Sequence, residues 1–264
     1  MAETTRSDTA RAVLAWYQAM GVDEAVADAP LDWAAARFEA SAPAEPTGTR
    51  SAKSPSAPRG APPAQRQETA AGGDLAHIET LDALRAEVAA FEGCGLKRTA
   101  KSLCFARGSP EARLMLIGEA PGRDEDLQGL PFVGRAGQLL DRMLRAISLD
   151  PEEVYITNTV YWRPPGNRNP SPQEVEACWP FLTRQVELVA PEIMVLLGGA
   201  AAKQMLQTSE GIMRLRGKWR DIAVGGHACR AIATLHPAYL LRNPLGKRLA
   251  WRDLLAIRDA LDGA

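Results

Sequence analysis

The sequence lacks a long hydrophobic run. No apolar segment among its 264 residues approaches the roughly 20 residues that a membrane span requires. Its first residues, MAETTRSDTARAVLAWYQ, include acids and have no apolar core, so no secretory signal is predicted and a cytoplasmic location is expected. Cysteine is scarce, and the four cysteines form no CxxC pair, which predicts reduced thiols rather than disulfides.

Charge of one sign is also lacking, because the formal net charge is only −1. The local distribution is uneven, since the segment from Arg214 to Arg252 contains nine basic residues and one acid, Asp221. Such a segment can form a phosphate-binding patch on a nearly neutral protein, or it can simply be solvated, and charge alone leaves both interpretations open. The nine are Arg214, Arg216, Lys218, Arg220, Arg230, Arg242, Lys247, Arg248 and Arg252.

Composition divides the chain into three parts. Apolar residues at helical spacing predict a short helical segment within residues 1–40. Residues 41–73 are rich in Pro, Ala and Ser and have little to bury, so they are predicted to form a disordered linker. The compact domain is expected over 74–264.

Strands and helices are predicted to alternate within that domain. This pattern favours an α/β fold with three layers (α/β/α) around a short, mainly parallel four-stranded sheet. Ligands in such folds bind beyond the carboxyl ends of the strands, which selects the loops 119–134, 158–170, 198–200 and 236–244. The predicted strands are 113–118, 154–159, 193–197 and 230–234; the predicted helices are 79–92, 137–147, 172–189, 200–206 and 247–261, with Ser171 as an N-cap.

Three of these loops carry residues suited to binding a planar polar ring. The loop GEAPGRDEDLQGLPFVG (118–134) contains Phe132, whose alternative role is a core plug. Asn158 ends a predicted strand and offers a donor beside an acceptor, as the O4 and N3–H edge of uracil requires, although it also suits a turn cap. His236 is fixed before a proline, and a purely structural role is open to it too.

Taken in order and spacing, GEAPG…PFVG, VYITN, RPPGNRNP and HPAYLLR resemble the uracil-DNA glycosylase superfamily, and most closely its family 4. The resemblance covers about residues 85–256. It implies a DNA-repair glycosylase that flips uracil out of single- or double-stranded DNA and hydrolyses the N-glycosidic bond, leaving an abasic site. A monomer without membrane association is expected.

The resemblance also implies roles for individual pocket residues. Phe132 would stack on the flipped base, and Asn158 would recognise the uracil edge. Glu125 would crowd the C5 position against the methyl group of thymine. His236 would donate a hydrogen bond to uracil O2, where negative charge develops. Ala120 stands where family 1 relatives have a carboxylate, so Glu119 or its backbone is expected to position the attacking water.

DNA contacts are implied outside the pocket. In HPAYLLR, Leu240 or Leu241 would wedge into the duplex and Arg242 would hold a phosphate. The LRGKW stretch at 215–219, with Arg214, Arg216 and Lys218, would grip the backbone.

Family 4 members hold a 4Fe–4S cluster on four cysteines, and this chain departs from that pattern. The corresponding positions are Phe91, Cys94, Trp162 and Cys178, so only two thiols remain. Cys104 and Cys229 would have to substitute from unrelated places in the sequence. We therefore predict no cluster and no other cofactor, with the two aromatic residues packed in its place.

Three alternatives stay open at this point. A covalent uracil-DNA trap would need an inserted loop with a nucleophilic histidine, which RPPGNRNP lacks. A glycosylase for hypoxanthine or mispaired uracil alone would favour Asn where Ala120 stands. An accessory DNA-binding module would bind uracil without releasing it.

Overall fold

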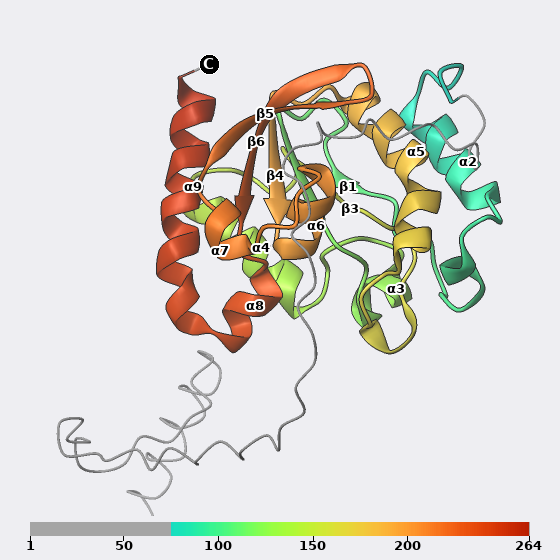
Figure 1. Cartoon of the computed structure of the whole chain (residues 1–264), viewed down its shortest axis with the longest axis horizontal. Coiled ribbons are helices and arrows are strands. Elements are labelled where there is room, and N and C mark those ends of the chain that lie inside the picture. Colours follow the sequence, from blue (N-terminus) through green and yellow to red (C-terminus); the bar gives the residue numbers. More distant parts are fainter. Residues whose placement is uncertain (1–74, 264) are drawn as a thin grey trace, which may run out of the picture. The chain divides into compact units, whose positions relative to one another are not determined.

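The computed structural model in Figure 1 describes residues 75–263. The predicted N-terminal helical segment (1–40) and linker (41–73) lie outside the described residues. No helix in the described part is both long and apolar enough to cross a bilayer.

A six-stranded sheet forms the centre of the described domain. Its strand order is β1-β3-β2-β4-β6-β5, and the four inner strands run parallel to one another. These four correspond to the predicted strands. The prediction missed two antiparallel edge strands, the two-residue β1 and the six-residue β5, which pair with β3 and β6. The bounds are β1 Arg107–Gly108, β2 Leu114–Gly118, β3 Tyr155–Asn158, β4 Ile193–Leu197, β5 Trp219–Val224 and β6 His227–Thr234.

Helices cover both faces of this sheet, which confirms the predicted three-layer α/β/α class (Figure 1). Side chains alternate between the faces along each inner strand, as the pleat requires. In β2, Met115 and Ile117 pack with residues of α5 and α6, whereas Leu114 and Leu116 pack with residues of α4 and α9. Both faces of the inner strands are therefore buried.

The long helices form where the sequence predicts them. Ser171 caps α5, since its side chain accepts a hydrogen bond from the Glu174 N–H at 3.3 Å and its own N–H donates to the Glu174 carboxylate at 2.7 Å. The longer helices are α2 Leu81–Ala90, α4 Arg135–Ala146, α5 Pro172–Val189, α6 Gly199–Met205 and α9 Lys247–Asp262. Short helical turns that the prediction missed are η1 Gly95–Arg98, α3 Arg123–Gln128, η2 Pro165–Asn167, α7 Ile212–Leu215, α8 Pro237–Arg242 and η3 Pro244–Gly246.

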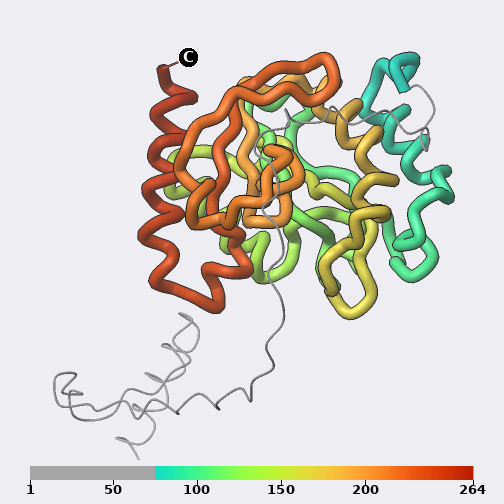
Figure 2. Tube along the Cα trace, viewed as in Figure 1, coloured from blue at the N-terminus to red at the C-terminus, as the bar shows by residue number. Residues whose placement is uncertain are grey.

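A separate apolar layer joins α2 and η1 to the outer side of α5. Leu84 and Val88 of α2 are buried there against Phe181 of α5. The trace in Figure 2 shows α2 beside α5, at the far side of the sheet from α9. This α2–α5 layer contains Cys94 and Cys178, two of the cluster positions discussed above.

Candidate active site

A hollow of about 390 Å³ lies where the inner strands end. Its walls come from three of the four predicted loops, and the fourth, 198–200, contributes Ala200 to a neighbouring hollow. The structure thus brings together residues that are more than 100 positions apart in the sequence. The lining residues are Glu119, Ala120, Pro121, Gly122, Glu125, Phe132, Ala136, Asn158, Pro164, Asn167, Arg168, Asn169, His236, Ala238, Tyr239 and Arg242.

The close approach of Phe132 and Asn158 depends on Gly118 at the end of β2. A methyl group on Gly118 would overlap both the Asn158 Oδ1 atom and the edge of the Phe132 ring. Any side chain at this position would therefore push the aromatic ring and the amide apart. Phe132 is only 5% exposed, and its backbone adopts φ 55°, a left-handed conformation that L-residues seldom adopt.

Asn158 has a buried amide with unmet hydrogen-bonding capacity. Its side chain is 1% exposed, and neither Oδ1 nor Nδ2 has a hydrogen-bond partner among the described residues. Leaving such a group buried and unpaired costs about 1–3 kcal/mol, so native proteins rarely do so without a reason. Either orientation of the amide presents one donor and one acceptor to the hollow.

His236 is held as a neutral imidazole. Its Nδ1 atom accepts a hydrogen bond from the Ala238 N–H at 3.1 Å, which places the ring proton on Nε2. Burial, reinforced by the nearby Arg242 guanidinium, lowers the pKa of His236 to about 4. Its ring centroid lies 5.6 Å from that of Phe132, with the two planes tilted by 32°. The site therefore offers a neutral N–H donor next to the aromatic ring.

Glu125 forms a fixed wall of the hollow. Its carboxylate accepts hydrogen bonds from the N–H groups of Gly122 at 3.1 Å, Val133 at 3.0 Å and Gly134 at 2.9 Å. The side chain thereby ties the GEAPG turn to the PFVG turn. These three bonds prevent the carboxylate from swinging out of the way of a ligand.

Glu119 and Ala120 follow β2 directly, and both line the hollow. Burial raises the pKa of the Glu119 carboxyl group above its ordinary value. The Glu119 backbone is anchored as well, since its carbonyl accepts a hydrogen bond from the Thr159 hydroxyl at 2.7 Å. The Ala120 side chain contributes no polar group to the hollow.

The residues predicted to contact DNA do not all suit that role. Leu240 is 1% exposed and packs in an apolar cluster with Leu139 and Leu235, which corrects the expectation that it could wedge into DNA. Arg216 forms a partly buried ion pair with Asp253 and donates to the Leu249 carbonyl, so its guanidinium is engaged in holding the fold.

The other predicted DNA contacts remain accessible. Arg214, Lys218 and Arg242 are exposed, and Leu241 is partly buried against the cluster around Leu240. The sequence analysis missed Leu245, which is 93% exposed on η3, the highest value among the large hydrophobic residues of the described part. The position of this leucine between Pro244 and Gly246, in a basic segment, is the sequence signal that could have indicated its exposure.

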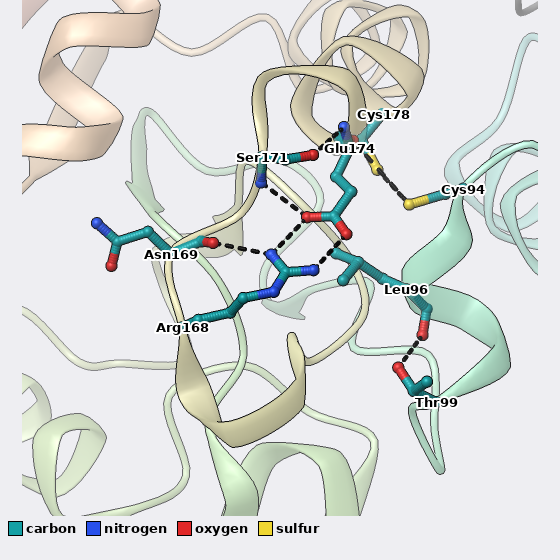
Figure 3. Close-up of polar contacts among 8 residues, drawn as sticks. All are labelled: Cys94, Leu96, Thr99, Arg168, Asn169, Ser171, Glu174 and Cys178. Carbon is teal, nitrogen blue, oxygen red and sulfur yellow. Dashed lines mark hydrogen bonds and ion pairs between the residues drawn. The ribbon is translucent and has the colours of Figure 1, made fainter.

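The remaining cysteines do not fit a four-cysteine cluster. Cys94 and Cys178 lie together, with the Cys178 thiol 3.9 Å from the Cys94 sulfur (Figure 3). The Cys104 thiol instead donates to the Glu125 carbonyl. Such a cluster typically needs four thiolates around one centre. The described residues contain no group of three or more His, Cys, Asp or Glu that could hold a metal ion.

Aromatic rings fill the same layer. The Phe91 ring meets the Phe181 ring edge-on, with their centroids 4.8 Å apart. Trp162, which is 3% exposed, packs edge-on against Tyr161 with a centroid distance of 6.2 Å.

An ion pair lies nearby. The Arg168 guanidinium donates to both carboxylate oxygens of Glu174, at 2.8 and 2.6 Å, and this pair ties the loop before α5 to the helix (Figure 3).

Comparison with known proteins identifies the family of the chain. The model of the uracil DNA glycosylase superfamily matches residues 105–255. A type-4 uracil-DNA glycosylase of Archaeoglobus fulgidus is 42% identical over 171 residues, which cover 63% of this chain and 86% of the relative. The type-4 enzyme of Saccharolobus solfataricus is 39% identical over 189 residues, covering 70% and 88%. The type-4 enzyme of Thermotoga maritima is 39% identical over 166 residues, covering 62% and 85%. This chain belongs to the uracil-DNA glycosylase superfamily.

Proposed function

We propose that this chain flips uracil out of DNA and hydrolyses its N-glycosidic bond, releasing free uracil and leaving an abasic site. The observation that carries the proposal is the buried, unpaired amide of Asn158 beside Phe132 and His236. A ligand that supplies one acceptor and one donor would remove the cost of leaving that amide unsatisfied.

Uracil fits this requirement through its O4 and N3–H edge. Asn158 Nδ2 would donate to O4 and Oδ1 would accept from N3–H, while cytosine presents the reverse pattern. Sites built to hydrogen-bond one edge reject a mismatched ligand strongly, because their buried polar groups are then left unpaired. Stacking on Phe132 would add about 1–3 kcal/mol, which helps to offset the cost of extruding the base.

Bond cleavage would use the neutral His236. As the glycosidic bond breaks, the sugar becomes oxocarbenium-like and the uracil becomes an anion. The Nε2–H of His236 would donate to O2, and the charge of Arg242 would favour the anion. These interactions strengthen as charge develops, so they lower the barrier selectively.

Glu119 would position the attacking water. Its carboxylate lines the hollow next to Ala120, and a raised pKa makes it a better proton acceptor than an ordinary surface glutamate. Glu125 would exclude thymine, because its hydrogen bonds to the two turns leave the C5 side of the base no room to expand.

DNA would be held outside the pocket by exposed basic groups and an inserted side chain. Arg214, Lys218 and Arg242 are available for phosphates. We propose Leu245, or the less exposed Leu241, as the side chain that enters the gap left by the flipped base. This assignment replaces Leu240.

We further propose that the chain works without the iron–sulfur cluster that the family 4 resemblance implies. The apolar packing of Phe91 and Trp162 supports this, since two of the four positions that would have to supply thiolates carry aromatic rings packed in this layer. The expected monomer and the cytoplasmic location stay predictions.

Base release from oligonucleotides tests the proposal. Single- and double-stranded substrates with one uracil, and matched substrates with hypoxanthine, would be incubated with the protein, and free base would be quantified. We expect uracil release from both forms and little release of hypoxanthine. Binding without release would favour the accessory module, and an SDS-resistant protein–DNA complex would favour the covalent trap.

A further inference from the structure

A second hollow of about 470 Å³ adjoins the first at the carboxyl ends of the strands. Glu119 and Asn169 line both hollows, so the two share part of their walls. The second hollow lies between the start of α5 and the helix α6, and it includes Ala200 from the one predicted loop that the first hollow does not use.

The walls of this second hollow combine flat apolar surface with polar groups. Pro170, Pro172 and Val175 form one side, and rings and branched carbons of this kind pack well against a planar base. Gln204 contributes from α6, and its Nε2 atom is buried without a hydrogen-bond partner in the described structure. Lys203, which is exposed at the same helix, supplies a positive charge for a phosphate.

We propose that this second hollow binds the base of a nucleotide next to the uracil on the same strand, an inference that rests on the proposed function. Adjacent nucleotides are joined by one phosphate, and the two hollows share a wall, so a strand that places uracil in the first passes over the second. Gln204 donates to a ring or carbonyl acceptor of the neighbouring base, while the Glu119 carboxylate accepts from an exocyclic amino group.

The chemistry of the site selects among neighbours. A base that has both an acceptor and an amino group, such as cytosine or adenine, meets Gln204 and Glu119 together, whereas thymine has no amino group. In duplex DNA the neighbouring base stays stacked and paired, so it does not reach the hollow. The preference is therefore a property of single-stranded substrates.

Uracil release from a set of oligonucleotides tests this inference. Each carries one uracil flanked by each of the four bases in turn, on the 5′ or the 3′ side, and kcat/KM is measured for single strands and duplexes. Gln204→Leu removes the donor, and Ala200→Leu fills the hollow from an exposed helix position. Gln138→Leu, an exposed glutamine of α4 outside both hollows, is the matched control.

For the wild type and Gln138→Leu we expect single-strand rates to vary roughly three- to tenfold with the neighbour, as one or two hydrogen bonds allow. Both hollow variants should flatten this profile and leave duplex rates unchanged. An unchanged profile in the variants, or equal slowing on single strands and duplexes, overturns the subsite while the glycosylase function stands. Absence of uracil release by the wild type overturns both.

Discussion

The candidate pocket around Asn158 and the α2–α5 layer differ in how their buried polar groups are paired. In the pocket, the Asn158 amide is buried and unpaired. Beside the α2–α5 layer, Tyr161 and Gln185 are equally buried, yet the Tyr161 hydroxyl donates to Gln185 Oε1 at 2.9 Å and Gln185 Nε2 donates to the Tyr155 hydroxyl at 2.7 Å. Tyr161 and Gln185 therefore stabilise the fold through their hydrogen bonds, whereas the Asn158 amide keeps its hydrogen-bonding capacity for a ligand.

This contrast implies that the unpaired amide of the pocket lowers the stability of the free protein, whereas the paired polar groups of the layer do not. An unpaired buried amide is unfavourable in the free protein, and the loss is recovered only when a ligand binds. The layer instead combines paired polar groups with apolar rings. Substitutions in the two regions should therefore separate activity from stability.

The largest effect is expected for Asn158→Ala. Loss of both hydrogen bonds to the base should lower kcat/KM for uracil DNA by about a thousandfold. The thermal midpoint should stay equal or rise, because an unpaired amide is removed. Tyr161→Phe is the matched control, which should cost about 1 kcal/mol of unfolding free energy and leave base release intact. A large fall in the midpoint of Asn158→Ala would show that its amide holds the fold.

Asn158→Asp sharpens the same test. A carboxylate offers two acceptors and no donor, so it cannot donate to uracil O4 as the amide would, and the preference for uracil over cytosine should weaken. Release of the two bases from matched oligonucleotides measures it. If both Asn158 variants behave as the wild type does, the pocket assignment is wrong.

His236→Ala should have the next largest effect. We expect the rate of base release to fall by more than tenfold, to a value on the order of a hundredfold below the wild type, because one preorganised donor is removed. Because the pKa of His236 is about 4, the imidazole is neutral from pH 5 to 8, and the wild-type rate should show no inflection from this residue there. A fall in rate as the pH rises through about 6.5, the ordinary histidine value, would indicate that the imidazolium is the active form.

The same pKa has a consequence for stability. The folded-state pKa lies below the unfolded value, so the unfolded chain binds more protons between them. The contribution of neutral His236 to the free energy of unfolding is fully present above about pH 6.5 and is lost as the pH falls toward about 4. Denaturant unfolding at a series of pH values should show the free energy of unfolding of the wild type rising with pH over this range. The rise should be shallower in His236→Ala.

A smaller effect is expected for Leu245→Ala on η3. If Leu245 enters the duplex, its loss should slow uracil release from double strands by about fivefold, since part of the unstacking cost is no longer offset. Single-strand rates should hardly change. Leu255→Ala, which removes a leucine that is 41% exposed on α9, is the control and should affect neither substrate. Equal rates for Leu245→Ala and the wild type on duplexes would exclude this wedge.

The inner sheet and the pocket were predictable because each rests on local sequence signals. Buried strands appear as short apolar runs, and their carboxyl ends place Phe132, Asn158 and His236 at one edge. The edge strand β5 was missed because only one of its six residues is fully buried and it forms no continuous apolar run, although the Gly225–Gly226 pair indicates a hairpin. Burial of Leu240 and the ion pair of Arg216 depend on tertiary packing, which motif spacing does not encode.

The smallest effect on base release is expected from restoring cysteines in the α2–α5 layer. Phe91→Cys with Trp162→Cys would bring four cysteines to the family cluster positions, together with Cys94 and Cys178. If Phe91 and Trp162 are the only reason that the chain does not fit a four-cysteine cluster, the double variant should bind iron when reconstituted. Visible absorption and iron and sulfide analysis measure this. The wild type treated in the same way is the control and should stay colourless.

Replacing Trp162 also removes a large buried side chain, which would cost several kcal/mol of stability if nothing took its place. Trp162→Ala should therefore unfold at a lower denaturant concentration than the wild type, while its folded fraction releases uracil at a nearly normal rate. A reconstituted double-cysteine variant that regains the lost stability would show that cluster and rings are interchangeable ways to hold α2 against α5. Iron in freshly purified wild type would instead mean that the rings do not replace a cluster here.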